Sequence, residues 1–578
     1  MKQAIRVICF SVYVFALLSA HAFAQNIPDA GILLQEQRQT VPKLPDRLPA
    51  EEKKEVLRPA LIDAGVRVLV KGFRFTGSFE GIVTEAELQA LVKDKIGKEL
   101  GFTELQQTVA HVTNYLREKK GFLLARAYLP RQDITEGTIE IAILAGRIDG
   151  KVKINLKQSV RIRPSVLEGI ADQSIPKDSP ARMERIERAV LIMNDLPGVN
   201  AQASLEPGDS PGSTRVVIDA AEGRLIHGVL SGDNYGDRYT GAYRGTGQVS
   251  INDITGFADS LSLYFTGAEN LLQGRGAYAI PLGSSGLIGS IYYSYLSYKL
   301  GKELTDLKAK GWAESAGVTL SYPCLRSRRA SIWSGAGFEY LMLDDEANNA
   351  KTRDRKVAAG NFNLTGSFYD DFGGGGLTNA NIIVTGGNVD LSGLQTNRLA
   401  DDLGPETAGG FWKGSYSLGR LQRVTRQFAL FGSLRGQYAS RNLDSSQKFI
   451  LGGPTGIRAY PIGEAAADEG HALTIETRYD VPSLPSWAST QVIGFFDTGW
   501  VKLHSSAWPG AITSASGRNE YFLSGAGVGL NVGKAGLYSA RVSYAFKIGP
   551  NEGKSMTGKD SDGLSDDGRF WLQLVIWI

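Results

Sequence analysis

Cysteine is nearly absent from this chain, which contains only Cys9 and Cys324 in 578 residues. Cys9 lies in an N-terminal stretch that has the pattern of a removable signal, so the processed chain would keep Cys324 alone. A single cysteine excludes an internal disulfide framework. For an exported protein, this means that the fold is held together by other means.

Long apolar runs are also scarce, and the clearest one is at the N-terminus. Lys2 and Arg6 form a basic start, residues 7–20 are apolar, and residues 22–24 read Ala-Phe-Ala. This pattern predicts a secretory signal peptide at residues 1–24, cleaved after Ala24. The alternative is a permanent membrane anchor, but about 14 apolar residues fall short of the ~20 that a spanning helix needs.

A strong excess of one charge is absent too, because the net charge is only +3. No field that would attract nucleic acid is implied, and we expect no nucleic-acid partner. Metal and nucleotide motifs are also missing. The histidines that remain after signal removal have no zinc spacing, and Gly525–Gly529 is glycine-rich without a helix after it. We therefore expect no metal, no cofactor and no enzyme activity.

Two segments follow the signal. Residues 25–64 are predicted to be a linker, because five prolines interrupt them and residues 51–55 are a run of charges. Within this linker, residues 31–39 have the pattern of a short amphipathic helix. The sequence leaves open whether that helix plugs a pore.

A compact α/β unit is predicted at residues 65–149, with the order β-α-α-β-β. Thr84 and Glu87 predict a capping box at the first helix. A second helix is predicted from Thr103, with Gln106 in the reciprocal position, and strands are expected at 122–128 and 138–144. The same order of elements recurs at residues 150–223, so two copies of one small unit stand in tandem.

Strand alternation replaces helical periodicity from residue 224 to residue 578. At roughly 22 residues per strand and connection, this region holds about sixteen strands. It contains all eight tryptophans, and aromatic residues at strand ends favour membrane-interface girdles. The last segment, 570–578, is apolar on one face, as a closing barrel strand should be. Residues 428–437 alternate in the same way. Ser433, Arg435 and Gln437 would line a pore, and Leu430 and Leu434 would face lipid.

The predicted fold class is therefore mainly β, with a C-terminal transmembrane barrel of about sixteen antiparallel strands after two α/β domains. A set of soluble β-sandwiches is the alternative. It is disfavoured because the meander shows no domain break over the whole of 224–578.

Several motifs resemble one known family. The layout and motifs are similar to the Omp85 superfamily, and within it to the two-partner secretion transporters of haemolysins and filamentous haemagglutinins (ShlB/FhaC/HecB-like). The motifs that carry this resemblance are Asp233–Gly236 with Tyr239–Gly241, Tyr322–Arg328, Asn442–Asp444, Gly452–Tyr460 and Phe495–Gly499. Two departures from the family pattern are Ala459, where many members have glycine, and the loosened segment 467–470.

The resemblance implies an outer-membrane pore of a Gram-negative cell with two periplasmic POTRA domains. These domains would recognise a secreted exoprotein of the haemolysin or filamentous haemagglutinin type, which the pore would carry to the cell surface. Its other implied partners are outer-membrane lipid and the barrel-assembly machinery for its own insertion. The alternatives are an outer-membrane protein assembly factor, an outer-membrane hydrolase, and POTRA domains that act only as spacers.

The glycine-rich segment 452–461 is the candidate site, because it holds one arginine among apolar neighbours. The resemblance implies that this loop folds into the barrel and that the strand at 495–499 receives it, so we expect Arg458 to form a bidentate ion pair with Asp497 there. The alternative is a pair that only stabilises the barrel. The supporting loop residues are Gly452, Gly453, Gly456, Ile457 and Tyr460, and the supporting strand residues are Phe496, which would meet lipid, and Gly499, which would leave space for the loop.

Overall fold

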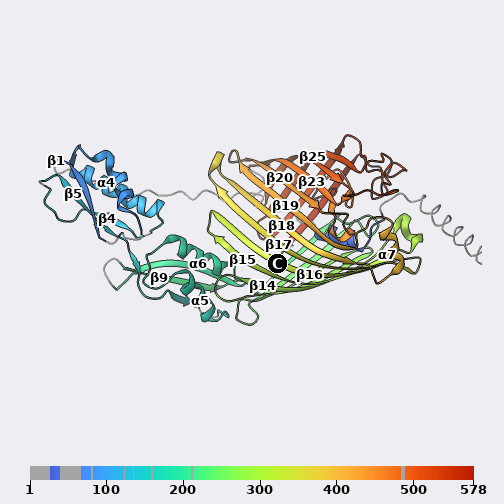
Figure 1. The fold of residues 1–578 in the computed structure, drawn as a ribbon, viewed down its shortest axis with the longest axis horizontal. Coiled ribbons are helices and arrows are strands. Elements are labelled where there is room, and N and C mark those ends of the chain that lie inside the picture. Colours follow the sequence, from blue (N-terminus) through green and yellow to red (C-terminus); the bar gives the residue numbers. More distant parts are fainter. Residues whose placement is uncertain are drawn as a thin grey trace, which may run out of the picture.

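The structure is a computed structural model in which two α/β units precede a large barrel (Figure 1). It describes residues 27–38, 67–77, 79, 82–122, 124–134, 136–157, 160–209, 213–482 and 488–578. The predicted signal peptide at 1–24 and residues 39–64 of the predicted linker lie outside the described residues. None of the helices in the described part of the chain is long and apolar enough to cross a membrane.

The first α/β unit contains the predicted β-α-α-β-β elements, with two additional short strands, one before the first helix and one between the two helices. Its elements are β1 (Arg67–Leu69), β2 (Gly72–Gly77), α3 (Glu85–Val92), η1 (Lys93–Lys95), β3 (Glu99–Gly101), α4 (Phe102–Asn114), η2 (Tyr115–Lys119), β4 (Arg126–Tyr128) and β5 (Thr138–Leu144). The sheet has the order β2-β5-β4, and β1 pairs with β3 beside it. Strands β2 and β4 are therefore the edges of this sheet.

The two helix starts of this unit differ in how well the sequence predicted them. The capping box at α3 is confirmed, because the Glu87 amide donates to Thr84 Oγ1 at 3.3 Å and the Thr84 amide donates to Glu87 Oε2 at 3.0 Å. The predicted cap at Thr103 and Gln106 is wrong. Helix α4 begins at Phe102, and the Gly101 amide donates to Glu104 Oε2 at 2.7 Å.

The predicted strand at 122–128 is also shorter than expected. The Phe122 amide donates to Leu116 O and the Ala125 amide to Phe122 O, so the chain after the helix turns before β4 begins.

The second unit repeats the arrangement. Its elements are β6 (Arg147–Ile148), β7 (Lys153–Leu156), α5 (Pro164–Ser174), α6 (Met183–Asp195), β8 (Val199–Pro207) and β9 (Ser213–Glu222). Strand β9 pairs in parallel with β6 and β7 and antiparallel with β8. The helices cover this sheet through fully buried residues such as Leu167, Ala189 and Met193.

Sixteen antiparallel strands then close into a barrel, which confirms the predicted fold class. The strands are β10 (Ile226–Asp233), β11 (Arg244–Asn252), β12 (Ser260–Ala268), β13 (Leu271–Pro281), β14 (Ile288–Lys299), β15 (Lys310–Arg326), β16 (Ala330–Ala347), β17 (Ala350–Asp370), β18 (Gly376–Asp390), β19 (Gly409–Arg423), β20 (Phe428–Ala439), β23 (Glu469–Asp480), β24 (Ser489–Lys502), β25 (Glu520–Lys534), β26 (Tyr538–Ile548) and β27 (Gly568–Trp577). Closure is made by β10 and β27, with Val229 opposite Trp577 and Asp233 opposite Gln573.

Short elements lie in the connections between barrel strands and in the segment that precedes the first α/β unit in the sequence. They are α2 (Ala30–Arg38), η3 (Lys302–Leu307), η4 (Phe372–Gly374), α7 (Gln395–Asp402), η5 (Ser445–Gln447), β21 (Phe449–Ile450) and β22 (Ala466–Ala467). We call the end of the barrel beside the second α/β unit the proximal end and the opposite end the distal end. Helix α7 lies at the distal end (Figure 1).

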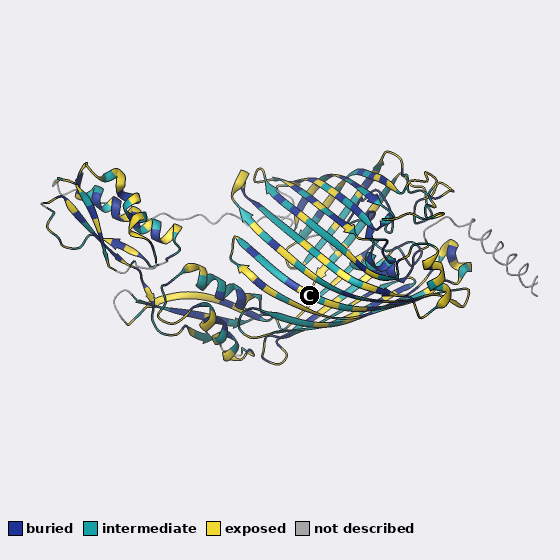
Figure 2. Cartoon of the chain, in the orientation of Figure 1, coloured by how far each residue is buried: buried dark blue, intermediate teal, exposed yellow. Residues whose placement is uncertain are grey.

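Exposure alternates along the barrel strands (Figure 2). On β20, the side chains of Leu430 and Leu434 are exposed on the outside, and Ser433 and Gln437 are buried inside, as the sequence predicts. Trp571 departs from the expected aromatic girdle. It faces inward and is 5% exposed, because its indole Nε1 donates to the carbonyl oxygen of Arg458 at 2.7 Å.

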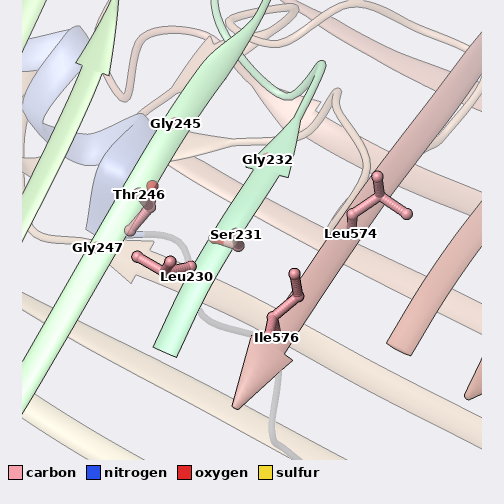
Figure 3. Close-up of a pocket in the computed structure, with 8 residues that line it drawn as sticks. All are labelled: Leu230, Ser231, Gly232, Gly245, Thr246, Gly247, Leu574 and Ile576. Carbon is pink, nitrogen blue, oxygen red and sulfur yellow. The ribbon is translucent and has the colours of Figure 1, made fainter. Parts of the chain in front are cut away.

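The closing seam leaves a shallow apolar depression on the outside of the barrel (Figure 3). Its border is formed by Leu230, Leu574 and Ile576, and its floor includes Gly232 and Gly247. The depression exists because these glycines carry no side chain where strands β10, β11 and β27 meet.

The second α/β unit contacts the proximal turns of the barrel. Arg326, near the end of β15, pairs with both carboxylate oxygens of Asp195 at 2.7 Å. Arg188 donates to the carbonyl oxygen of Pro323 at 2.9 Å. The motif at 322–328 therefore joins the barrel to helix α6, and this contact fixes the unit beside the opening of the barrel.

Candidate functional site

The connection between β20 and β23 folds back into the barrel, as the sequence predicts. Ile457, Ala459 and Tyr460 are fully buried. They pack with inward-facing side chains of the wall, among them Phe495 on β24 and Leu523 on β25. This contact explains why the loop carries apolar residues, since water would otherwise surround them.

The three loop glycines make the turn possible for two different reasons. Gly453 has a φ of +106°, which favours glycine over other residues. Gly452 and Gly456 have no such φ, but they leave no room for a side chain. A Cβ at Gly452 would lie 2.7 Å from Glu464 Cβ, and one at Gly456 would overlap the carbonyl oxygen of Leu451.

Arg458 lies at the inner end of this loop, and its guanidinium group makes a bidentate contact with the carboxylate of Asp497. Its Nε donates to Asp497 Oδ2 and its Nη2 donates to Asp497 Oδ1, each at 2.8 Å. The Arg458 amide also donates to Asp497 Oδ2 at 3.2 Å. Asp497 additionally accepts a bond from Thr474 Oγ1 at 2.9 Å. The carboxylate is buried and fully bonded, and such charge-assisted pairs are the strong ones.

The same arginine has further partners that the sequence reasoning missed. Its Nη1 donates to Glu476 Oε1 at 2.7 Å, and Glu476 Oε2 in turn accepts two bonds from Arg478. The guanidinium also stacks 3.5 Å from the centre of the Phe495 ring. One signal was available: on strand 469–480, Thr474, Glu476 and Arg478 lie at alternate positions, between neighbours that are mostly apolar, and so share the inward face. Arg458 and Arg478 therefore form one buried network with the carboxylates of Glu476 and Asp497.

Two glycines on the barrel wall make space for the loop. Phe496 is exposed on the outside and Asp497 is buried inside, which matches the predicted alternation. A Cβ at Gly499 would overlap Leu451 Cδ1, so this glycine leaves the predicted space. Gly525 on β25 does the same for the loop, because a Cβ there would lie 2.5 Å from Ala459 Cβ.

Gly525→Ala should therefore loosen the loop, and Ala459→Gly should restore it. The added methyl group meets the Ala459 methyl group, and crowding of this kind costs about 1–3 kcal/mol. The measurement is limited trypsin digestion, which cleaves after Arg458 only when the loop leaves the wall. We expect faster cleavage in Gly525→Ala and slower cleavage in the double variant.

The matched control for this prediction is Gly529→Ala on the same face of β25. A Cβ there would meet Val542, Ser543 and Ile493 of the wall but no loop atom. Equal cleavage of Gly525→Ala and the unmodified chain would contradict the proposed contact, and so would a double variant that is cleaved as fast as Gly525→Ala.

A second element, helix α2, also lies inside the barrel (Figure 1). Leu33 and Leu34 are buried, and they pack with inward-facing side chains such as Leu296 and Leu341. At its end, Arg38 pairs with Glu339 of β16, with Nη2 to Oε1 at 2.6 Å. The sequence predicted a short helix at 31–39 but left its place open, and the structure places it in the lumen.

The start of this helix is held by a buried ion cluster. Arg355 of β17 contacts Asp29 at 3.3 Å, Asp345 at 2.6 Å and Asp444 at 3.0 Å. Arg353 also pairs with Asp29. Burial alone would raise the pKa of Asp29, but the positive charges of Arg355 and Arg353 lower it to about 2. The motif residue Asp444 therefore shares its arginine with the start of helix α2.

Helix α2 also presses on the inward loop. Its Gly31 lies against η5, where a Cβ would come within 2.6 Å of the Ser446 amide nitrogen. Glu36 approaches Gly463 at the end of the loop. Burial and the nearby carboxylate of Asp237 raise the pKa of Glu36 well above its ordinary value. The helix and the loop thus fill the distal part of the lumen together.

In the part of the chain that the structure describes, no group of three or more histidine, cysteine or acidic side chains is arranged to hold a metal ion. The contacts described above are ion pairs and packing contacts, and they hold two internal elements against the barrel wall.

Comparison with known proteins gives two family matches. A model described as haemolysin secretion/activation protein ShlB/FhaC/HecB matches residues 212–532. A second model, the POTRA domain of the ShlB type, matches residues 68–146.

Individual relatives are similar over most of their length. The heme/hemopexin transporter protein HuxB of Haemophilus influenzae (strain 86-028NP) is 26% identical over 86% of this chain and 84% of its own. The outer membrane transporter CdiB of Escherichia coli O6:K15:H31 is 24% identical over 73% of this chain and 71% of its own. The solved structure of CdiB from Escherichia coli matches with a TM-score of 0.69 and 19% identity, covering 94% of this chain and 95% of that one.

Proposed function

This chain belongs to the haemolysin secretion/activation protein family ShlB/FhaC/HecB, whose model matches more than half of it, and we propose that it exports one large partner exoprotein of the haemolysin or filamentous haemagglutinin type. It is an outer-membrane transporter of two-partner secretion, and its POTRA domains lie in the periplasm. The proximal end of the barrel is thus the periplasmic end. The family match over the barrel carries this conclusion and favours secretion over the assembly of other barrels.

The order of domains supports a path for the exoprotein. We assign residues 1–24 to a signal peptide, 25–64 to a linker, 65–149 and 150–223 to the two POTRA domains, and 224–578 to the barrel. The second POTRA domain contacts the barrel opening through the Arg326–Asp195 pair, so a chain bound to the POTRA domains lies beside the pore. A barrel of this size encloses a channel.

The first POTRA domain offers edges to which an extended exoprotein can add as a strand. Strands β2 and β4 each pair only with β5 within the described sheet. Main-chain hydrogen bonds along such an edge give affinity without requiring a folded partner. The transporter acts by binding and passage, not by catalysis, and folding of the exoprotein outside the cell draws it through. The barrel-assembly machinery inserts the transporter itself.

Removal of the first POTRA domain should abolish export while the barrel still inserts. The experiment expresses the chain together with the large exoprotein encoded beside it, and measures exoprotein in the medium per heat-modifiable barrel in the outer membrane. Deletion of residues 66–149 should reduce export to background, because the recognition edges are lost. Unchanged export after this deletion would show that the domain acts only as a spacer. Absence of export by the complete chain would contradict the proposed function.

We propose that the Arg458–Asp497 pair keeps the inward loop in its working position. The support is the buried network of Arg458, Glu476 and Arg478, which ties the loop to two neighbouring strands. The loop residues Gly452, Gly453, Gly456, Ile457 and Tyr460, together with Phe496 and Gly499 on the strand, serve this placement.

A further inference from the structure

One sector of the lumen wall carries no charge at all. It consists of residues 317–321 on β15, 331–337 on β16, 361–367 on β17, 379–385 on β18 and 415–419 on β19, all of them described. We call this sector the neutral wall. Its inward-facing side chains are mostly asparagine, serine and threonine.

The register of the strands shows which residues of this sector face inward. Glu339 and Arg355 face the lumen, since they bind Arg38 and Asp29 of the internal helix. Residues an even number of positions away on the same strand share that face, and so do their partners across the sheet. One such row runs from Ser321 through Gly335, Asn363 and Ile383 to Ser415. The alternate residues, such as Phe338 and Phe362, are exposed on the outside.

Two asparagines of this wall have side-chain amide groups that are available for hydrogen bonds with a passing chain. Asn363 lies over Gly335, where a Cβ would come within 2.7 Å of Asn363 Nδ2, and Asn361 lies over Gly337 in the same way at 3.1 Å. No hydrogen bond joins the side chains of Asn361 or Asn363 to any other described residue. Each amide can donate to and accept from a peptide backbone.

The neutral wall extends from the contact with the second POTRA domain at one end to the contact with helix α2 at the other. At the periplasmic end, Ser331 lies beside Arg326, which holds the second POTRA domain through Asp195. At the other end, charges return with Glu339, which binds helix α2, and Lys413, which donates to Gln447 O at 2.8 Å. The wall beyond β20 differs, since β23 and β24 carry the charged side chains of Glu476, Arg478 and Asp497. The uncharged surface therefore connects the domain that receives the exoprotein with the helix that fills the lumen.

We infer that the neutral wall is the surface along which the exoprotein's extended backbone slides, an inference that rests on the proposed function. A polypeptide in transit carries side chains of both signs, and a charged wall inside a confined lumen would hold the segments of opposite sign. Neutral amides and hydroxyls exchange their bonds with water at little net gain, so each contact is weak. The wall thus binds backbone of any sequence and releases it.

Adding charge to this wall should slow export. The paired variants Asn363→Asp with Asn381→Asp, and Asn363→Lys with Asn381→Lys, should each lower the rate of exoprotein release about fivefold, because charged segments pause there. Release is measured per heat-modifiable barrel, so that poor insertion does not count as slow export.

The matched control places the same charges elsewhere in the lumen. Ser262 on β12 and Ala277 on β13 are inward-facing partners outside the neutral wall. The pair Ser262→Asp with Ala277→Asp should leave the rate unchanged. Normal export by both charged Asn363 pairs would overturn the inference, and so would equal slowing by the control pair. If the complete chain exports nothing, the proposed function has failed instead.

Cross-linking gives a second readout that does not need a charged variant to fold. In a Cys324→Ser background, a cysteine at position 363 or 262 is tested for disulfide formation with a single-cysteine exoprotein halted during export. We expect cross-links from Asn363→Cys and few from Ser262→Cys. The reverse pattern, or equal yields, would show that the exoprotein does not follow this wall.

Discussion

Arg458→Ala should leave an inserted barrel that exports little exoprotein. The substitution removes the partner of Asp497, which is fully buried, and one partner of Glu476. Breaking a buried pair in this way costs about 3–5 kcal/mol, because the remaining charge is stranded. The loop then loses its position on the wall. The measurement is exoprotein in the medium, scaled to heat-modifiable barrel in the outer membrane.

Companion variants separate the role of the pair from general damage. Asp497→Ala should resemble Arg458→Ala, and Arg458→Lys should restore export only in part, since lysine lacks the planar fork. The double variant Arg458→Ala with Asp497→Ala should regain barrel stability without regaining export. Arg518→Ala is the matched control, because its pair with Glu552 is at the surface and is worth about 0–1 kcal/mol.

Two outcomes would decide against this reading. Normal export by Arg458→Ala would show that the arginine is not needed for transport. Loss of the barrel itself in Arg458→Ala, with export recovered in the double variant, would show that the pair only stabilises the barrel.

Removal of helix α2 should open the channel. The helix fills the distal lumen through Leu33 and Leu34 and is held at its two ends by Asp29 and Arg38. Deletion of residues 27–38 should raise the single-channel conductance in planar bilayers several-fold, because ions then pass where the helix lay. The deletion also removes Asp29, one of the three carboxylates that contact Arg355. Arg355 keeps Asp345 and Asp444 as partners, so the barrel wall should remain stable.

A point variant tests the same idea without a deletion. Gly31→Val should also raise the conductance, since its side chain would collide with η5 at Ser445 and Ser446. Ile32→Val is the matched control, because Ile32 is only partly buried and the change removes one methylene group. Equal conductance of the deletion variant and the complete chain would show that the helix does not obstruct the channel.

The sequence by itself determined the fold class and one pair of the site. Alternation of apolar and polar residues is a local property, so the strands of the barrel and the faces of Leu430 and Ser433 follow from neighbouring residues alone. The Arg458–Asp497 contact was predicted in two steps. A permanent charge among apolar residues requires a buried partner, and the resemblance to the family identified 495–499 as the strand that receives the loop, with one carboxylate on its inward face.

Only the tertiary structure decided what surrounds that pair and what fills the barrel. Glu476 and Arg478 join the network because β23 lies beside β24 in a particular register, and Asp29 meets Arg355 across more than 300 positions of sequence. The neutral wall is likewise invisible in any single strand, since uncharged stretches are common in barrel strands. Barrel closure stacks five of them side by side, because the register between strands is set by pairing over the whole sheet and not by the residues of one segment.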